Sequence, residues 1–242
     1  MQTNQTGTPV VLLYHRIGRP KLASLVAGQY VAPWLFRSGL DYLTAKGWCG
    51  ARLAGIAARL CDGDKFAVTF DDGYLSVYEH AFPAMVERNM TGTVYVVSGA
   101  IGGINEWDRR AGDTREPMMT AAQAREMADA GFEIGSHTVN HPHLTLIPDD
   151  QLEQEIVDSK RALEDIIGKE VISFSYPYGD LDERVTQAVI AAGYKYAVVT
   201  KLGVPASGGA FEIPRVNVRW NAIGPLLMRK IRRAKRASGI RN

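Results

Sequence analysis

The chain has 242 residues, 46% hydrophobic and 22% charged, a balance typical of a soluble globular protein that excludes a disordered or fibrous chain. A chain of this length buries roughly 70 to 75% of its unfolded surface, so it folds without a disulfide or structural metal, and we expect any metal to be catalytic. The net charge of +2 is uneven: residues 1–214 hold 19 basic and 26 acidic residues, whereas residues 215–242 hold nine basic and no acidic ones.

Short apolar runs rich in β-branched and aromatic residues recur along the chain, and most precede a stretch with helical spacing. This alternation predicts parallel β/α units. Thr120 and Gln123 have the spacing of a helix capping box, and further helices are predicted at about residues 149–167 and 182–192. The predicted strands are Val10–Tyr14, Phe66–Phe70, Thr93–Val97, Phe132–Ile134, Val171–Ser175, Tyr196–Thr200 and Ile213–Val218.

Seven strands without a dinucleotide-type glycine-rich turn favour an α/β fold in which a closed or nearly closed β/α barrel forms one domain. Segments 20–29 and 99–116 are predicted surface loops. In such a barrel the loops after the strands build the active site. Polar or turn-forming residues follow four of the predicted strands, namely His15, Asp71 with Asp72, His137, and Pro177 with Tyr178.

Asp71 and Asp72 lie side by side after an apolar strand, where two carboxylates repel each other unless a cation or proton neutralises one. The alternative is a solvated Asp-Asp-Gly turn. His137 and His141 have the spacing of paired metal ligands on a helical turn, although Pro142 places His141 where helical geometry ends. Taken alone, each histidine is more often a packed or surface residue, and His80 and His143 keep that interpretation.

One carboxylate and two imidazoles suit a divalent cation, with Zn²⁺ as the first expectation and Co²⁺, Ni²⁺, Mn²⁺ or Fe²⁺ as alternatives. Such a cation activates a water molecule and polarises a carbonyl. The carboxylate that does not bind the metal is free to take the proton of the water as general base.

Three motifs together resemble the polysaccharide deacetylases with a NodB homology domain, carbohydrate esterase family 4. They are residues 69–73 (Thr-Phe-Asp-Asp-Gly), 137–141 (His-Thr-Val-Asn-His) and 175–179 (Ser-Tyr-Pro-Tyr-Gly). The resemblance implies a distorted (β/α) barrel and makes Asp71 the general base. It also makes Asp72, His137 and His141 the metal ligands, and the backbone N–H of Tyr178, after Pro177, an oxyanion donor. On this basis we divide the chain into an extension (residues 1–9), a NodB-like domain (10–220) and a basic tail (221–242).

The chain departs from the family pattern at two positions. Ser175 stands where many members have an arginine that orients the base, and Arg215 is the candidate replacement, unless it belongs only to the basic tail. No histidine follows His143, although most members carry a catalytic one near the C-terminus. His15 resembles the motif of a circularly permuted branch that includes exopolysaccharide deacetylases, so we expect it to protonate the leaving amine; the alternative is a buried structural histidine.

Trp107 lies in the predicted loop 99–116, where its ring either stacks on a sugar or covers the small core of the loop. In the tail, four apolar residues fall near one face of a predicted helix that is otherwise basic. This pattern indicates peripheral contact with anionic lipid, and the alternative is a solvated end docked on the acidic body. Nucleic acid is not an expected partner, because no recognition motif supports it. The apolar residues are Leu226, Leu227, Ile231 and Ala234.

The first nine residues lack the pattern of a signal peptide, and no apolar run approaches the roughly 18 residues that span a bilayer. We therefore expect a cytoplasmic location, peripheral at the inner membrane surface if the tail binds lipid, although a chain trimmed of its leader would look the same. The expected function is a metal-dependent hydrolase that removes N-acetyl groups from amino sugars. Two alternatives stay open: hydrolysis of a cyclic amide or other non-peptide C–N bond, and an inactive sugar-binding homologue.

Overall fold

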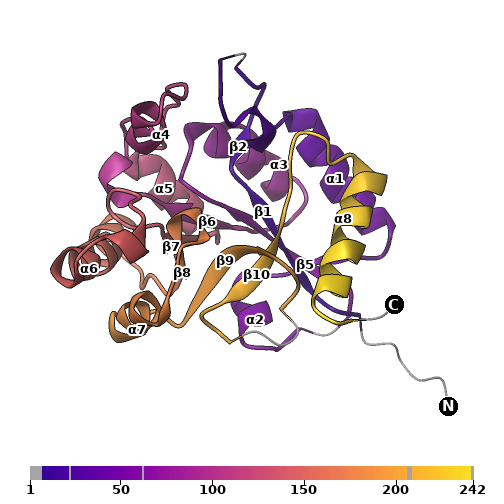
Figure 1. Ribbon diagram of the computed structural model, residues 1–242. Coiled ribbons are helices and arrows are strands. Elements are labelled where there is room, and N and C mark those ends of the chain that lie inside the picture. Colours follow the sequence, from indigo (N-terminus) through magenta and orange to yellow (C-terminus); the bar gives the residue numbers. More distant parts are fainter. Residues whose placement is uncertain (1–6, 22, 62, 206–208, 241–242) are drawn as a thin grey trace.

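Seven parallel strands form a closed ring in the computed structural model, which describes residues 7–21, 23–61, 63–205 and 209–240 (Figure 1). The ring closes because β1 pairs with β5 on one side and with β10 on the other. The predicted β/α barrel in a single domain is therefore confirmed. The ring runs in the order β1 (Val10–Tyr14), β10 (Ile213–Asn217), β9 (Tyr196–Leu202), β8 (Ser173–Ser175), β7 (Glu133–Ser136), β6 (Thr93–Val96) and β5 (Lys65–Phe70).

Three short strands lie outside the ring. β4 (Cys49–Gly50) pairs with the first two residues of β5, and β2 (Arg16–Ile17) pairs with β3 (Tyr30–Val31) beyond the end of β1. The 3-10 turns and the five-residue π-helical turn at Val77–Ala81 connect the longer elements.

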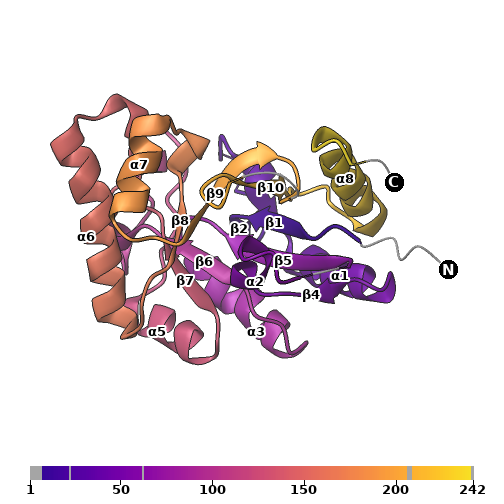
Figure 2. The ribbon, with the colours of Figure 1, turned by 90° about the horizontal axis from the view of Figure 1, so that it is seen from below.

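Helices surround the ring, with α6 and α7 side by side on one flank and α1 and α8 on the other (Figures 1 and 2). None of the described helices is both long and apolar enough to cross a bilayer. The helices are α1 (Pro33–Ala45), α2 (Leu53–Ala57), α3 (Phe82–Val86), α4 (Glu106–Arg110), α5 (Ala121–Asp129), α6 (Asp149–Ile167), α7 (Glu183–Ala191) and α8 (Gly224–Ala237).

The helix boundaries follow local signals in the sequence. Thr120 and the side chain of Gln123 form the predicted capping box of α5. α6 ends at Gly168, whose φ of 66° lies in the left-handed region that glycine adopts without strain. Asp182 caps α7 by accepting a hydrogen bond from the backbone N–H of Val185 at 2.8 Å.

The strands alternate between two apolar cores, as the period of two in a β-strand requires. Val10 and Leu12 of β1 belong to the large core that the outer helices cover. Val11 belongs to a smaller core with Ala67 and Tyr95, to which α2 also contributes. The second core therefore lies inside the barrel, and the inward positions further along each strand lead to its carboxyl end.

Two sequence predictions need correction. Segment 99–116 is not only a surface loop, because it contains α4 and fully buries Asn105. In α8, Leu227, Ile231 and Ala234 are buried, and Leu227 approaches Gly39 of α1, whereas Leu226 is 37% exposed and does not share their face. The apolar face of this helix is thus covered by the body of the protein. Residues 1–6 of the predicted extension and residues 241–242 of the tail lie outside the described residues.

Candidate active site

The inward-facing positions change from apolar to polar near the carboxyl ends of the strands. On β5 the inward series continues from Ala67 through Thr69 to Asp71, and on β10 it runs through Arg215. Arg215 reaches across the barrel, because its guanidinium donates to Thr69 of β5 and also to Ser175 of β8. The barrel therefore gathers side chains that lie more than 100 residues apart in the sequence.

Asp72, His137 and His141 form a compact group of potential metal ligands. The Nε2 atoms of both histidines lie 3.4 Å from Oδ1 of Asp72, and all three side chains are buried. A metal site of this kind needs at least three His, Cys, Asp or Glu side chains with their ligand atoms close to one another. Within the described part of the chain, this is the one group that meets the requirement.

Strained turns bring these three side chains together. Asp72, Thr138 and His141 have φ values of 76°, 69° and 59°. Residues other than glycine rarely adopt this backbone conformation, which costs of order 1–3 kcal/mol for each residue. The two histidines therefore meet through a turn rather than a regular helix. The hydroxyl of Thr138 closes this turn by accepting a hydrogen bond from the backbone N–H of His141 at 2.9 Å.

The polarity of the group suits a cation. Nδ1 of His137 lies 2.6 Å from the carbonyl oxygen of Ser175, and since a carbonyl only accepts, Nδ1 carries the proton. In the neutral ring, Nε2 then directs a lone pair toward the carboxylate of Asp72, so that acceptor faces acceptor until a positive charge lies between them.

The pKa directions agree with this requirement for positive charge. Burial lowers the pKa of His137, but its hydrogen bond to Asp72 and the charges of Asp71 and Asp72 together raise it by more. The pKa therefore lies above the ordinary histidine value. For His141 burial dominates, and its pKa is lowered. Burial opposes ionisation of Asp72, yet the two histidines hold its pKa well below the usual range.

Asp71 is held by two parallel hydrogen bonds from Arg215. Nη1 lies 2.7 Å from Oδ1 and Nη2 lies 2.7 Å from Oδ2, and both side chains are almost completely buried. Ser175 adds a hydrogen bond to Oδ2 at 3.2 Å. Burial raises the pKa of Asp71, but the charge and hydrogen bonds of Arg215 outweigh burial and leave it lowered. The carboxylate is therefore ionised and fixed in orientation.

Seven of the nine predicted site residues line one cavity of about 410 Å³ at this end of the barrel: His15, Asp71, Asp72, Trp107, His137, His141 and Tyr178. Of the other two, Arg215 lies behind Asp71, and buried Pro177 precedes Tyr178. Nδ1 of His15, Nδ1 of His141 and Oδ1 of Asn217, which also lines the cavity, are buried without a hydrogen-bond partner among the described residues. Unpaired buried polar atoms are uncommon, and an ion, a water molecule or a ligand can satisfy them.

His15 is placed at the cavity, directly after β1, but its charge state is shifted. Burial lowers the pKa of the imidazole by more than Asp72 and Asp71 raise it, and the charges of Arg215 and Arg16 lower it further. His15 is therefore neutral near pH 7. For it to act as an acid, it must first take up a proton.

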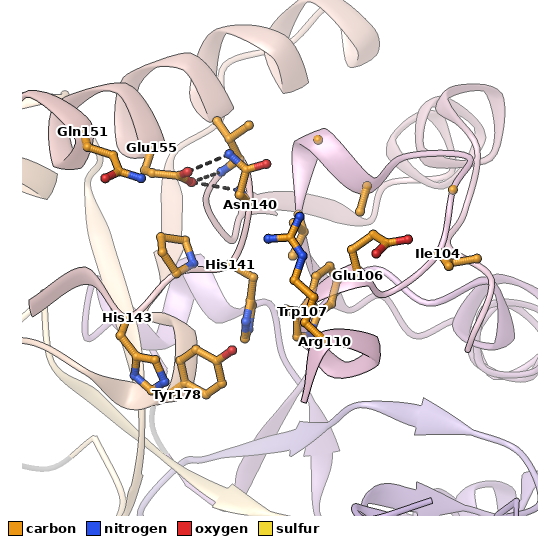
Figure 3. Close-up of a pocket in the computed structure, with 16 residues that line it drawn as sticks. Ile104, Glu106, Trp107, Arg110, Asn140, His141, His143, Gln151, Glu155 and Tyr178 are labelled. Carbon is orange, nitrogen blue, oxygen red and sulfur yellow. Dashed lines mark hydrogen bonds between the residues drawn. The ribbon is translucent and has the colours of Figure 1, made fainter. Parts of the chain in front are cut away.

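Trp107, His141 and Tyr178 line both this cavity and a second cavity of about 660 Å³. Figure 3 shows the residues that line the second cavity. The ring of Trp107 stacks on that of His141, with centroids 4.8 Å apart. Tyr178 has a φ of 60°, and its ring stacks on His143 with centroids 3.9 Å apart. His143 therefore lines the second cavity, a position that the sequence pattern around His143 did not indicate.

Two acidic residues at the site were missed by the sequence analysis. Glu155 of α6 is 3% exposed and accepts hydrogen bonds from the backbone N–H groups of Val139 and Asn140 and from the Asn140 side chain, at 2.7–2.8 Å (Figure 3). It therefore fixes the loop between His137 and His141. Asp108 of α4 lines the cavity of about 410 Å³. The only sequence signal for Glu155 was its acidic side chain on the mainly apolar face of a helix.

The fold and the site together define a β/α-barrel protein with a buried group that can hold a metal ion, next to an ionised carboxylate. The family model for polysaccharide deacetylases matches residues 61–197, more than half of the chain. The chain thus belongs to the polysaccharide deacetylase family, an enzyme class that hydrolyses non-peptide carbon–nitrogen bonds, and the resemblance seen in the sequence is confirmed.

Individual relatives extend this similarity over most of the chain. YxkH of Bacillus subtilis (strain 168), whose name assigns it to the polysaccharide deacetylases, is 27% identical over 221 residues, covering 90% of this chain and 74% of the relative. The structure of IcaB from Ammonifex degensii is 25% identical with a TM-score of 0.80, covering 93% of this chain and 97% of that one. The Streptococcus pyogenes deacetylase PplD, solved in complex with acetate, shares the fold at 24% identity and a TM-score of 0.79, covering 93% of this chain and 99% of that one.

Proposed function

We propose that this protein is a metal-dependent N-deacetylase that removes acetyl groups from N-acetylated amino sugars in a polysaccharide, an oligosaccharide or a lipid-linked precursor. The observation that carries the proposal is the buried Asp72, His137 and His141 group beside an Asp71 carboxylate held by Arg215. Membership of the polysaccharide deacetylase family supports the reaction class.

Asp72, His137 and His141 would hold the cation, and their mixed oxygen and nitrogen donors make Zn²⁺ the first candidate, with Co²⁺, Ni²⁺, Mn²⁺ and Fe²⁺ as alternatives. When bound, the cation lowers the pKa of a water molecule and polarises the acetamide carbonyl. Metal analysis of protein purified without added metal, followed by reconstitution with each ion, identifies the ion.

In this proposal, Asp71 accepts the proton of the attacking water, and Arg215 keeps it ionised for that purpose. The backbone N–H of Tyr178 donates a hydrogen bond to the oxygen on which negative charge develops. His15, after taking up a proton, transfers it to the nitrogen as the C–N bond breaks, so that acetate and a free amine leave. Trp107 offers an aromatic surface to the sugar at the mouth of the cavity.

The test is a screen for acetate release from N-acetylglucosamine oligomers, lipid-linked sugars and nucleotide sugars, with and without chelator. We expect chelator-sensitive release from at least one amino-sugar class and none from matched glucosamine controls. Turnover confined to a parallel panel of cyclic amides would overturn the sugar assignment in favour of the alternative hydrolase. Sugar binding without release from any metal-loaded sample would indicate an inactive homologue.

The outer face of α8 supports a proposal about location. Because its apolar face packs against α1, insertion of that face into lipid is not available in this structure, and only charge attraction can act. Arg229, Arg232, Arg233 and Arg236 are exposed around a surface hollow of about 530 Å³ that has no acidic lining residue among those described. We propose that this face contacts anionic lipid headgroups, which would place a cytoplasmic enzyme at the inner membrane surface.

Cosedimentation with vesicles tests this contact. Wild-type protein should bind phosphatidylglycerol vesicles at low salt and not phosphatidylcholine vesicles, and changing the four arginines to glutamine should abolish binding while acetate release is kept. Equal binding of wild type and variant would contradict the proposal. Truncation of the tail is a poorer test, because it would expose the core residues that α8 covers.

A further inference from the structure

Asp108 is an acidic side chain in the catalytic cavity that has no part in the proposed chemistry. It follows Trp107 on α4, and both residues line the cavity that also contains Asp71 and Asp72. Its side chain is 20% exposed, so it faces the cavity without being freely solvated. A third carboxylate near two others is electrostatically unfavourable unless a positive charge or hydrogen-bond donors compensate it.

A buried network compensates the charge of Asp108 and fixes its orientation. Arg16 is 1% exposed and forms a hydrogen-bonded ion pair with Oδ2 of Asp108. Tyr74 donates to the same oxygen at 2.8 Å, and the Asn105 amide donates to it at 3.0 Å. Within the described part of the chain, every hydrogen bond to the side chain of Asp108 ends on Oδ2, which leaves Oδ1 for a ligand.

The other carboxylate held by Arg16 is a natural reference. Asp113 accepts from the arginine at 3.3 Å, from the hydroxyl of Ser24 at 3.2 Å and from the backbone N–H of Leu25 at 2.8 Å. Asp113 does not line the catalytic cavity. The same arginine thus holds one carboxylate that ties two loops together and another that faces the reaction site.

An ionised carboxylate oxygen can only accept hydrogen bonds, and an amino sugar offers hydroxyl donors at known ring positions. Trp107 lies directly before Asp108 and supplies the apolar surface that a sugar ring covers. We propose that Oδ1 of Asp108 accepts a hydrogen bond from one free hydroxyl of the sugar ring that carries the scissile acetamide. Asp108 would thereby select substrates in which that hydroxyl is unsubstituted. This inference rests on the proposed N-deacetylase function.

The test measures kcat/KM for the methyl glycoside of an N-acetylglucosamine oligomer and for three analogues of it. Each analogue lacks the 3-, 4- or 6-hydroxyl of the reacting ring. For wild type, one analogue should lose about 10- to 100-fold, the effect of a hydrogen bond to a charged group. In Asp108→Asn the side-chain oxygen can keep the bonds of Arg16 and Tyr74 while the amide faces the cavity as a donor. The variant should therefore be slower on the parent sugar and distinguish it from that analogue by less than about threefold.

Asp113→Asn is the matched control, since it makes the same chemical change on the same arginine away from the cavity, and it should keep the wild-type discrimination. Asp108→Glu, which retains the charge but displaces the oxygen, should also lose discrimination and serves if Asp108→Asn does not fold. The inference is overturned if wild type deacetylates the parent and all three analogues equally, or if the folded Asp108 variants keep the wild-type ratio. Absence of acetate release from the parent sugar would instead overturn the proposed function.

Discussion

Replacing Arg215 by methionine removes the positive charge that faces both oxygens of Asp71 while keeping most of the side-chain volume. Removing one partner of a buried ion pair leaves an uncompensated charge, which typically costs about 3–5 kcal/mol of folding free energy. Both hydrogen bonds are 2.7 Å long and both side chains are buried, so we expect Arg215→Met to lie in this range.

The same change has a definite sign in the pH profile. Burial raises the pKa of Asp71 and Arg215 is the main influence that lowers it. Removing the arginine leaves only the weaker effects of His137 and His15 to oppose burial, so the pKa should rise. Because the base must be ionised, the acid limb of kcat/KM should move to higher pH and activity at neutral pH should fall. Each unit of pKa change corresponds to a factor of about ten in the ionised fraction below the pKa.

The assay is kcat/KM for acetate release against pH, with metal content and the free energy of unfolding measured on the same samples. Ser175→Ala is the control, because it removes the hydroxyl that donates to Asp71 at 3.2 Å and accepts from Arg215 at 3.0 Å but keeps the positive charge of the arginine. It should therefore move the acid limb less than Arg215→Met does. An Arg215→Met enzyme that keeps its metal, its rate and the parental acid limb would refute the role assigned to this arginine.

Three further predictions concern other residues of the barrel. Glu155→Ala should weaken metal affinity about 10- to 100-fold, because it frees the loop between His137 and His141, and an unchanged dissociation constant in metal titrations would contradict this. His15→Ala should lower kcat about 10²- to 10⁴-fold at unchanged metal content, and a parental rate would remove His15 from the mechanism. The pKa of Glu133 is raised above its ordinary value, because burial raises it by more than the hydrogen bonds of Ser173 and Tyr196 lower it. The contribution of Glu133 to folding stability is therefore fully present below its unfolded-state pKa and is lost as pH rises through its folded-state pKa. Chemical denaturation should therefore show a wild-type loss of stability across that interval that Glu133→Gln lacks, and identical pH dependence of the two proteins would exclude Glu133 as its source.

The sequence was sufficient for the barrel because its strands are short apolar runs bounded by clear turn signals. The structure has β1 at its predicted bounds, and the other predicted strands of the ring differ from the observed ones only at their ends. The dipeptide-length strands β2, β3 and β4 were not predicted, since two residues carry no periodicity.

The site was predictable where chemistry lies in local motifs and not where it depends on long-range contacts. The pair Asp71 and Asp72 and the two histidines could be selected by residue type and spacing, whereas the choice of Asp72 as the metal ligand came from the family resemblance. The ion pair between Arg16 and Asp108 joins residues that lie 92 positions apart in the sequence. The sequence around each of these residues has no local pattern that predicts the pair. The exposure of Leu226 was missed because its place on the helix surface depends on how α8 rotates against α1.

The central claim is that Asp72 belongs to a metal site while its neighbour Asp71 acts as the base. The most direct measurement is metal content together with acetate release for Asp71→Asn and Asp72→Asn, compared with wild type. Asp71→Asn should retain the metal and lose at least about 10²-fold in kcat, whereas Asp72→Asn should lose metal affinity. Full activity in Asp71→Asn, or full metal occupancy and affinity in Asp72→Asn, would contradict the account.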